Sequence, residues 1–154
     1  MSSYANFYLR RGECFIPIGS WSRNTYIYNH VSPYAGNFEK VKALSSQNIE
    51  MILESLLEEK KALKKYKKSE QEKYKMLLNT SLSTEEIEIM YDDFQKNMDE
   101  INEEIKYLKG NINYMRFLLT IVDDSKYSEI LDNNKLVYVG IESPENIKPE
   151  DIDE

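Results

Sequence analysis

The stretch Gly19-Ser20-Trp21-Ser22-Arg23-Asn24 holds residue types that could bind an anion. It follows an apolar run that predicts a strand, and it leads into a predicted short helix over residues 23–31 with Ser22 as the N-cap. Free N–H groups at a helix N-terminus, together with the charge of Arg23, could hold a phosphate. The stretch matches neither the P-loop nor the dinucleotide fingerprint. A capped helix with Trp21 packed on a sheet is the simpler interpretation. The candidate anion-binding residues are Ser20, Ser22, Arg23 and Asn24.

The chain has one histidine, His30, and one cysteine, Cys14. No Asp or Glu precedes His30 within helical reach, so we interpret it as an ordinary surface or capping histidine. Cys14 stands beside Phe15 in an apolar run, where we expect a buried and unreactive thiol. A single cysteine also excludes an intramolecular disulfide and a four-cysteine metal site. We expect no catalytic residue, no metal site and no cofactor.

Arginines and aromatic residues recur in the first part of the chain, at Arg10, Arg11, Trp21, Arg23, Tyr26 and Tyr34. A basic aromatic patch suits single-stranded nucleic acid or the anchor of a protein interface. Because the net charge is −7, phosphate neutralisation is weak, and we expect no direct binding to nucleic acid. The candidate protein-binding residues from this patch are Trp21, Arg23 and Tyr26.

These residues must be positioned by elements that are organised around residues 83–123. Apolar residues recur there at alternating steps of four and three, at Phe94, Met98, Ile101, Ile105, Leu108, Ile112, Met115, Leu119 and Val122. This heptad seam predicts a long helix that faces another helix. Gly110 lies inside the seam without changing its phase, so we expect one continuous helix. Ser83 and Glu86 form a capping box at its start.

Residues 47–78 predict a partner helix with a weaker seam, at Ile49, Ile52, Leu56, Leu63, Tyr66, Tyr74 and Leu77. Between Lys60 and Lys75, eight Lys and two Glu give a net charge of +6. Between Glu85 and Glu104, nine acidic residues and one Lys give a net charge of −8. If the chain reverses near Ser81, the two blocks face each other and each residue lies opposite one whose number is 162 minus its own. We therefore predict an antiparallel coiled-coil hairpin.

A small base completes the predicted fold, which is α+β and mostly α. Residues 4–10 and 14–18 predict a β-hairpin with Pro17 at an edge or a bulge, and residues 135–141 predict a third strand. We expect an α+β base with a three-stranded antiparallel sheet and a short helix over residues 1–44 plus 124–143. The helical hairpin then occupies residues 45–123, and an acidic flexible tail occupies residues 144–154.

The turn end of the predicted hairpin has no cover in a single chain. Apolar residues lie off the seam there, at Met76, Leu78, Ile89, Met90 and Tyr91. We therefore expect a homodimer through the hairpin or a docked partner protein. The acidic residues of the second helix could also mimic a nucleic-acid backbone, although a solvated helix face explains them more simply. The candidate protein-binding residues here are Glu85, Glu88, Met90, Tyr91, Asp92 and Asp93.

The first residues, MSSYANFYLRR, lack the basic and apolar segments of a signal peptide. No stretch approaches 18 consecutive apolar residues, so we expect no membrane span. Both observations favour a cytoplasmic location.

The opening NFYLRRGECFIPIGSWSRNTYIY, the long charged hairpin and the closing KLVYVGIES resemble small accessory proteins encoded by bacteriophages and prophages of Gram-positive bacteria. No catalytic motif accompanies this resemblance, so no site residue follows from it. By analogy with anti-CRISPR proteins, it implies a non-enzymatic protein that binds and inhibits a host protein. The implied target is a CRISPR–Cas type defence component, and the implied location is the host cytoplasm. Two alternatives stay open: a small-nucleotide or phosphate binder that uses residues 19–24, and a structural coiled-coil scaffold.

Overall fold

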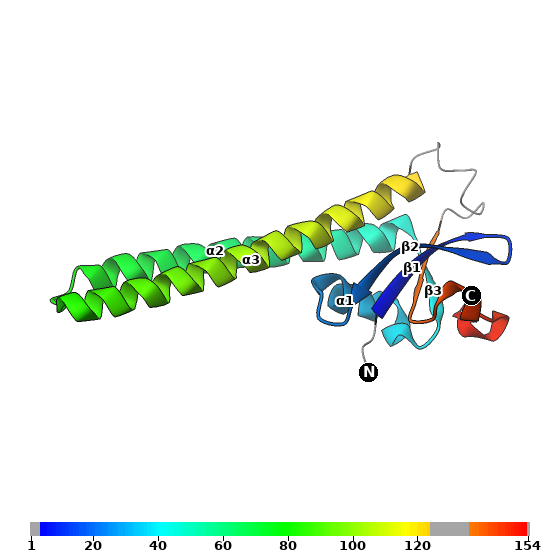
Figure 1. Cartoon of the computed structure of the whole chain (residues 1–154). Coiled ribbons are helices and arrows are strands. Elements are labelled where there is room, and N and C mark those ends of the chain that lie inside the picture. Colours follow the sequence, from blue (N-terminus) through cyan, green and yellow to red (C-terminus); the bar gives the residue numbers. More distant parts are fainter. Residues whose placement is uncertain (1–3, 124–135, 154) are drawn as a thin grey trace. The chain divides into compact units, whose positions relative to one another are not determined.

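A computed structural model describes residues 4–123 and 136–153 of the chain. Its contacts form two compact units, which we call unit 1 (Met1–Leu56 with Asn111–Glu154) and unit 2 (Leu57–Gly110). The long helices α2 (Ser46–Leu78) and α3 (Thr84–Asp123) each contribute one part to each unit (Figure 1). The units therefore divide within the long helices, whereas we expected divisions at residues 44/45 and 123/124.

Unit 1 contains a five-stranded sheet in the order β2-β1-β4-β3-β5. Its strands are β1 (Tyr4–Arg11), β2 (Cys14–Ser22), β3 (Val41–Leu44), β4 (Val137–Gly140) and β5 (Ile152–Asp153). The predicted hairpin is confirmed as β1 and β2, and the predicted third strand is confirmed as β4 beside β1. The prediction of a three-stranded antiparallel sheet is wrong, because β3 and β5 extend the sheet and pair with each other in parallel.

Residues 144–153 do not form the expected tail. They contain two 3-10 turns, Pro144–Asn146 and Pro149–Asp151, followed by β5. The Lys148 backbone N–H donates to Asp151 Oδ2 at 2.9 Å, which closes the second turn. Asp153 then pairs with Lys42 of β3 at 3.9 Å. A strand of two residues is too short to show the alternation that predicts strands.

Pro17 lies at a bulge in the edge strand β2, as expected. Phe7 of β1 pairs with Gly19, whereas the next residue, Tyr8, pairs with Pro17, so Ile18 is the extra residue. The bulge leaves the Ile18 carbonyl available, and the Tyr114 hydroxyl of α3 donates to it at 3.2 Å. Irregular pairing in the edge strand therefore anchors the part of α3 that belongs to unit 1.

Both faces of the sheet are covered in unit 1. On one face, the Tyr114 ring contacts Phe7 and Trp21 at centroid distances of 5.4 and 5.2 Å. On the other face, Tyr8, Val41 and Tyr138 form a buried cluster, packed against Phe15, Ala43, Leu136, Ile147 and Ile152. The segment after β4 therefore supplies a second small core. Unit 1 also contains α1 (Tyr26–Val31), with Ile27 and Val31 buried.

The seam predicted for α3 is confirmed from Met98 to Met115 and at Val122, whereas Leu119 is only partly buried and its neighbour Leu118 is fully buried. The helix is continuous through Gly110, and its buried residues include Met98, Ile101, Ile105, Leu108, Ile112, Met115 and Val122. The seam predicted for α2 is confirmed at Ile49, Ile52 and Leu56. It is wrong at Tyr66, which is 49% exposed, because the half-buried positions after Leu63 are Lys67, Glu70 and Tyr74. Long polar side chains can bury their stems in such a seam while their charges reach water.

The two helices of unit 2 run antiparallel, but not in the predicted register. Glu70 Oε2 accepts from Asn97 Nδ2 at 3.3 Å, and Tyr74 stacks on Phe94 with ring centroids 4.1 Å apart. The expected reversal at Ser81 would instead place Glu70 opposite Asp92. The connection over residues 79–83 carries no helix and accommodates this displacement along α3. Coiled-coil supercoiling stays a prediction.

Tyrosine burial in unit 1 predicts a loss of stability in alkali. Burial raises the pKa of Tyr8 to about 12 and also raises the pKa of Tyr114. The unfolded chain ionises both phenols near pH 10, so their contribution to stability is complete below about pH 10 and declines as the pH rises towards 12. Urea denaturation between pH 8 and 12 should show a shallower alkaline decline for Tyr114→Phe than for the wild type. Tyr91→Phe, at an exposed position, should keep the wild-type decline; equal slopes for all three proteins would contradict this account.

Candidate protein-binding surface

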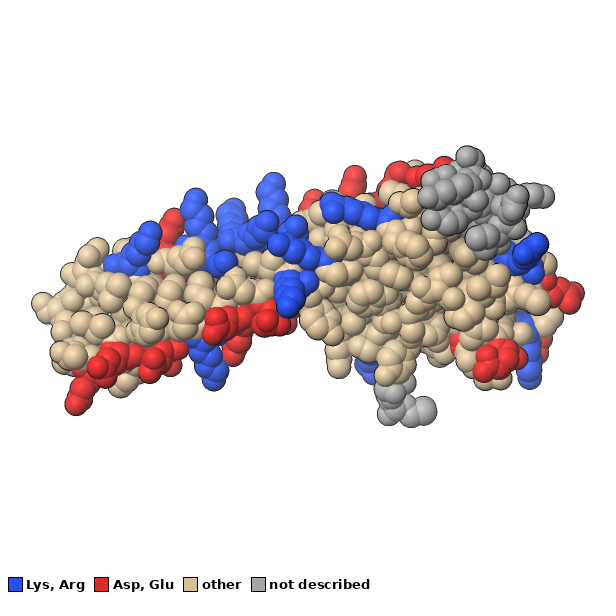
Figure 2. All heavy atoms as spheres, turned by 45° about the horizontal axis from the view of Figure 1, so that its top comes forward, with Lys and Arg blue, Asp and Glu red and all other residues tan. Residues whose placement is uncertain are grey.

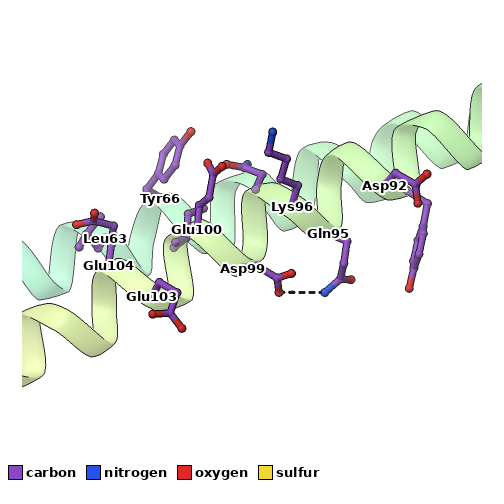
Figure 3. Close-up of a pocket in the computed structure, with 12 residues that line it drawn as sticks. Leu63, Tyr66, Asp92, Gln95, Lys96, Asp99, Glu100, Glu103 and Glu104 are labelled. Atoms are coloured by element: carbon purple, nitrogen blue, oxygen red, sulfur yellow. Dashed lines mark hydrogen bonds between the residues drawn. The ribbon is translucent and has the colours of Figure 1, made fainter.

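Unit 2 has two faces, because residues three or four apart share one flank of a helix. We call one the hollow face; its residues are Ala62, Tyr66, Ser69, Lys73 and Leu77 of α2 with Met90, Asp93, Asn97 and Glu100 of α3. We call the other the charged face; its residues are Lys64, Lys68, Gln71, Lys75 and Leu78 of α2 with Glu88, Tyr91, Asp92, Gln95 and Asp99 of α3. Figure 3 shows Tyr66 and Glu100 on one side of α3 and Gln95 and Asp99 on the other.

A hollow of about 310 Å³ gives the hollow face its name. The stacked rings of Tyr74 and Phe94 line it, together with Leu77 and Met90. Its polar rim is tied together, because Glu70 accepts from Lys73 Nζ at 3.4 Å and from Asn97 Nδ2 at 3.3 Å. Asp93 adds a carboxylate at the same rim. An apolar floor with an acidic rim is suited to a side chain that is apolar along its stem and basic at its end.

Large apolar side chains lie in water around the turn of unit 2. Met76 is 71% exposed, Ile89 is 63% exposed and Tyr91 is 53% exposed, and Leu77, Leu78 and Ile87 are each at least 41% exposed. These residues occupy the last turns of α2 and the first turns of α3. A cluster of exposed apolar side chains on a helical surface is typical of a site that another protein covers.

A larger open hollow of about 910 Å³ runs along α3, where it meets both faces. Figure 3 shows the side chains that line it, and the dashed line marks the 3.4 Å hydrogen bond from Gln95 to Asp99. Two aromatic residues, Tyr66 and Tyr91, stand among acidic lining residues, which are Asp92, Asp99, Glu100, Glu103 and Glu104. Aromatic anchors with surrounding negative charge favour a partner surface that is basic.

The nine predicted protein-binding residues fall in both units. Met90 and Asp93 line the hollow, whereas Glu88, Tyr91 and Asp92 lie on the charged face. Glu85 lies in the first turn of α3. The residues that lie in unit 1 are Trp21, Arg23 and Tyr26.

The predicted N-cap Ser22 is wrong. Thr25 caps α1, and its Oγ1 accepts from the Tyr28 N–H at 3.3 Å. The Ile27 N–H donates instead to the buried Asn111 Oδ1 of α3 at 2.9 Å. The observed helix N-terminus lies after residues 19–24, and two of its N–H groups bind side chains of the protein itself.

The remaining anion-binding candidates lie in or just after β2. Ser20 Oγ donates to Asn6 Oδ1 at 2.7 Å, and the Ser22 carbonyl accepts from Thr25 Oγ1 at 2.7 Å. Arg23 and Asn24 are exposed in the turn before α1. Gly19 has a packing role, because a Cβ atom there would clash with the Tyr114 hydroxyl group. Anion binding by this stretch stays a prediction.

Arg10 and Trp21 of the predicted basic patch lie on opposite faces of the sheet, while Arg23, Tyr26 and Tyr34 lie outside the strands. The Arg10 guanidinium lies 5.5 Å from the Phe15 ring centroid, on the face that carries Tyr138. Trp21 packs on Tyr114, on the opposite face. The one histidine of the sequence also has a hydrogen-bond partner within unit 1, because His30 Nδ1 is hydrogen-bonded to Ser55 Oγ. Cys14 is exposed at the start of β2, so the expectation of a buried thiol is wrong.

Sequence reasoning missed the surface roles of Tyr66 and Leu77, because both fit the seam that it assigned to α2. The observed seam runs from Leu63 to Tyr74 through Lys67 and Glu70, and the polarity of these two residues argued against this choice. Testing both phases against the charge pattern could have found this alternative.

Loss of the Asn111 side chain should destabilise unit 1. In Asn111→Ala, the Ile27 N–H loses its buried acceptor, and we expect a cost of about 1–3 kcal/mol in the free energy of unfolding. Asn113→Ala is the matched control, because Asn113 is exposed two residues further along the same helix. We expect a change below about 0.5 kcal/mol for this control. Chemical denaturation of the three proteins measures both effects, and equal stabilities for the two variants would refute the assigned role.

Among the described residues, no group of three or more His, Cys, Asp or Glu side chains could hold a metal ion. Within the same residues, no helix combines the length and apolar character needed to cross a membrane. Comparisons of the chain with protein-family models, with curated proteins and with solved structures gave no match.

Proposed function

We propose that this protein acts by binding another protein through the hollow face and turn of unit 2, and that it catalyses no reaction. The observation that carries the proposal is the exposure of Met76, Leu77 and Ile89, three large apolar side chains near the connection between α2 and α3. Each leaves apolar area in water that a partner would remove, at roughly 25 cal/mol per Å². The neighbouring hollow, floored by Tyr74 and Phe94, could receive an anchoring side chain.

The charge around this surface defines the partner further. Asp93 and Glu100 stand beside the hollow on α3, and the acidic lining of the larger hollow continues their charge. Complementary charge accelerates encounter and selects among partners more than it adds affinity. A partner with basic side chains around an apolar anchor therefore fits this face.

A narrower proposal adds the identity of the target. The sequence resemblance to phage and prophage accessory proteins supports a protein that inhibits a host defence component of the CRISPR–Cas type. This step rests on that resemblance alone. Two other proposals, a phosphate or nucleotide binder at residues 19–24 and a structural scaffold, have less support. For the first, the Ile27 and Tyr28 N–H groups already have acceptors.

Affinity capture tests the proposed surface. The purified protein is immobilised and exposed to lysate of a Gram-positive bacterium, beside a double variant, Met76→Glu with Ile89→Glu. We expect the wild type to retain a distinct protein and the double variant to lose it, because the new carboxylates would have to be buried unpaired. Recovery of a CRISPR–Cas component would support the narrower proposal.

Met51→Glu is the matched control. Met51 is 48% exposed on the part of α2 that belongs to unit 1, so this variant makes the same chemical change away from the proposed surface. It should retain the captured protein. Equal retention by all variants would place the interaction elsewhere, and copurification of a nucleotide that Arg23→Ala abolishes would favour the phosphate-binding alternative.

A further inference from the structure

The charged face of unit 2 separates its charges by helix. Figure 2 shows the basic side chains of unit 2, all of them lysines, gathered along one of its long edges and most Asp and Glu along the other. On α2, Lys64, Lys68 and Lys75 share the charged flank, while on α3 it carries Glu88, Asp92 and Asp99. Within the described residues, none of these lysines forms an ion pair with these carboxylates in the single chain. Two complementary charged surfaces therefore lie side by side on one face.

The helical register places these opposite charges at equal heights. Tyr74 is stacked on Phe94, and Glu70 is bonded to Asn97. Counting outward from these two pairs along antiparallel helices, Lys75 is level with Asp92, and Lys68 is level with Asp99. By the same count, Leu78 lies one or two residues from the level of Tyr91, and these residues are 43% and 53% exposed. At these two heights, each helix therefore carries the charge opposite to that of the other helix.

Symmetry then decides how two copies could pair through this face. A two-fold axis across the helices would stack α2 on α2 and α3 on α3, so like charges would meet. A two-fold axis along the helices stacks α2 of each copy on α3 of the other and keeps every height unchanged. Lysines of one copy then meet aspartates of the other, and each helix has only oppositely charged, antiparallel neighbours. This arrangement is a four-helix bundle.

We propose that the charged face is a homodimer interface, in which two units 2 pair about a two-fold axis along their helices with their turns at the same end. Lys68 of one copy then meets Asp99 of the other, and Lys75 meets Asp92. Leu78 of one copy packs on Tyr91 of the other, twice in the symmetric pair. The hollow faces point outward, so the dimer leaves the hollow floored by Tyr74 and Phe94 free, whereas it covers Tyr91, Asp92 and Asp99 at the edge of the larger hollow.

A cysteine at the turn tests the pairing geometry. Ser81→Cys is made in a Cys14→Ser background, so that the turn carries the sole thiol of the full-length chain. A short bismaleimide should link two copies into a covalent dimer, because the turns lie together. Ser69→Cys in the same background is the control; this exposed residue lies on the hollow face and should give little dimer. Strong linking at position 69 and none at position 81 would overturn the proposal.

Charge exchange tests the interface itself. Sedimentation equilibrium should show that Lys68→Glu with Lys75→Glu raises the dimer dissociation constant about tenfold or more, because attraction becomes repulsion at four places. Adding Asp92→Lys with Asp99→Lys to the same chain restores complementarity and should return the constant to within about threefold of the wild type. Circular dichroism of each variant verifies that the helices persist.

Three results would overturn the proposal: a wild type that stays monomeric at high micromolar concentration, a dissociation constant insensitive to the first pair of substitutions, or no recovery in the fourfold variant. All of these measurements use the purified chain alone. Failure of self-association would therefore leave the capture experiment unaffected, and failure of capture would leave the dimer unaffected.

Discussion

Two helices that pack only on each other bury one stripe each, and this limit governs what unit 2 can be. Its core consists of Met98, Ile101 and Ile105, with Leu63 and Phe94 packed against them. Polar residues complete the stripe on α2, where Glu70 is held by Asn97 and Lys73. The remaining large apolar residues near the turn stay in water. The surface that we assign to partners is thus a consequence of having too few helices to cover it.

Unit 1, in contrast, covers its apolar residues with its own elements. The sheet has Tyr114 of α3 on one face and the segment after β4 on the other, so all of β4 and the central residues of β1 are buried. Tyr114 illustrates how closely the layers fit, because its ring fills the space that Gly19 leaves and its hydroxyl bonds the carbonyl at the bulge. The groups in this unit that could take part in chemistry or binding, such as the His30 ring and the Ile27 N–H, are already hydrogen-bonded to other side chains of the unit. This contrast directs the functional argument to unit 2.

The sequence predicted the features that depend on the spacing of apolar residues. It missed the features that depend on contacts with elements distant in the chain. The seam of α3 repeats over four heptads, so its burial could be read from spacing alone. The seam of α2 contains Lys67 and Glu70, whose burial depends on the partner helix, and its phase was misassigned at Tyr66. The two-residue strand β5 exists only because β3 offers an edge, which no local pattern records. Likewise, the acceptor for the Ile27 N–H in α1 is Asn111, more than eighty residues away in the chain. The apolar turn was foreseen, whereas the hollow was not, because its floor needs the observed register of Tyr74 on Phe94.

Amide hydrogen exchange measured over a range of protein concentrations tests the central claim most directly, namely that unit 2 is incompletely covered in a single chain. Exposed helices with few buried contacts open more readily than a covered sheet. We expect residues 57–110 to gain protection as the concentration rises, while the strands of unit 1 keep the same protection throughout. Strong protection of residues 57–110 that does not change with concentration would contradict the account, because the two helices would then be stable without any partner.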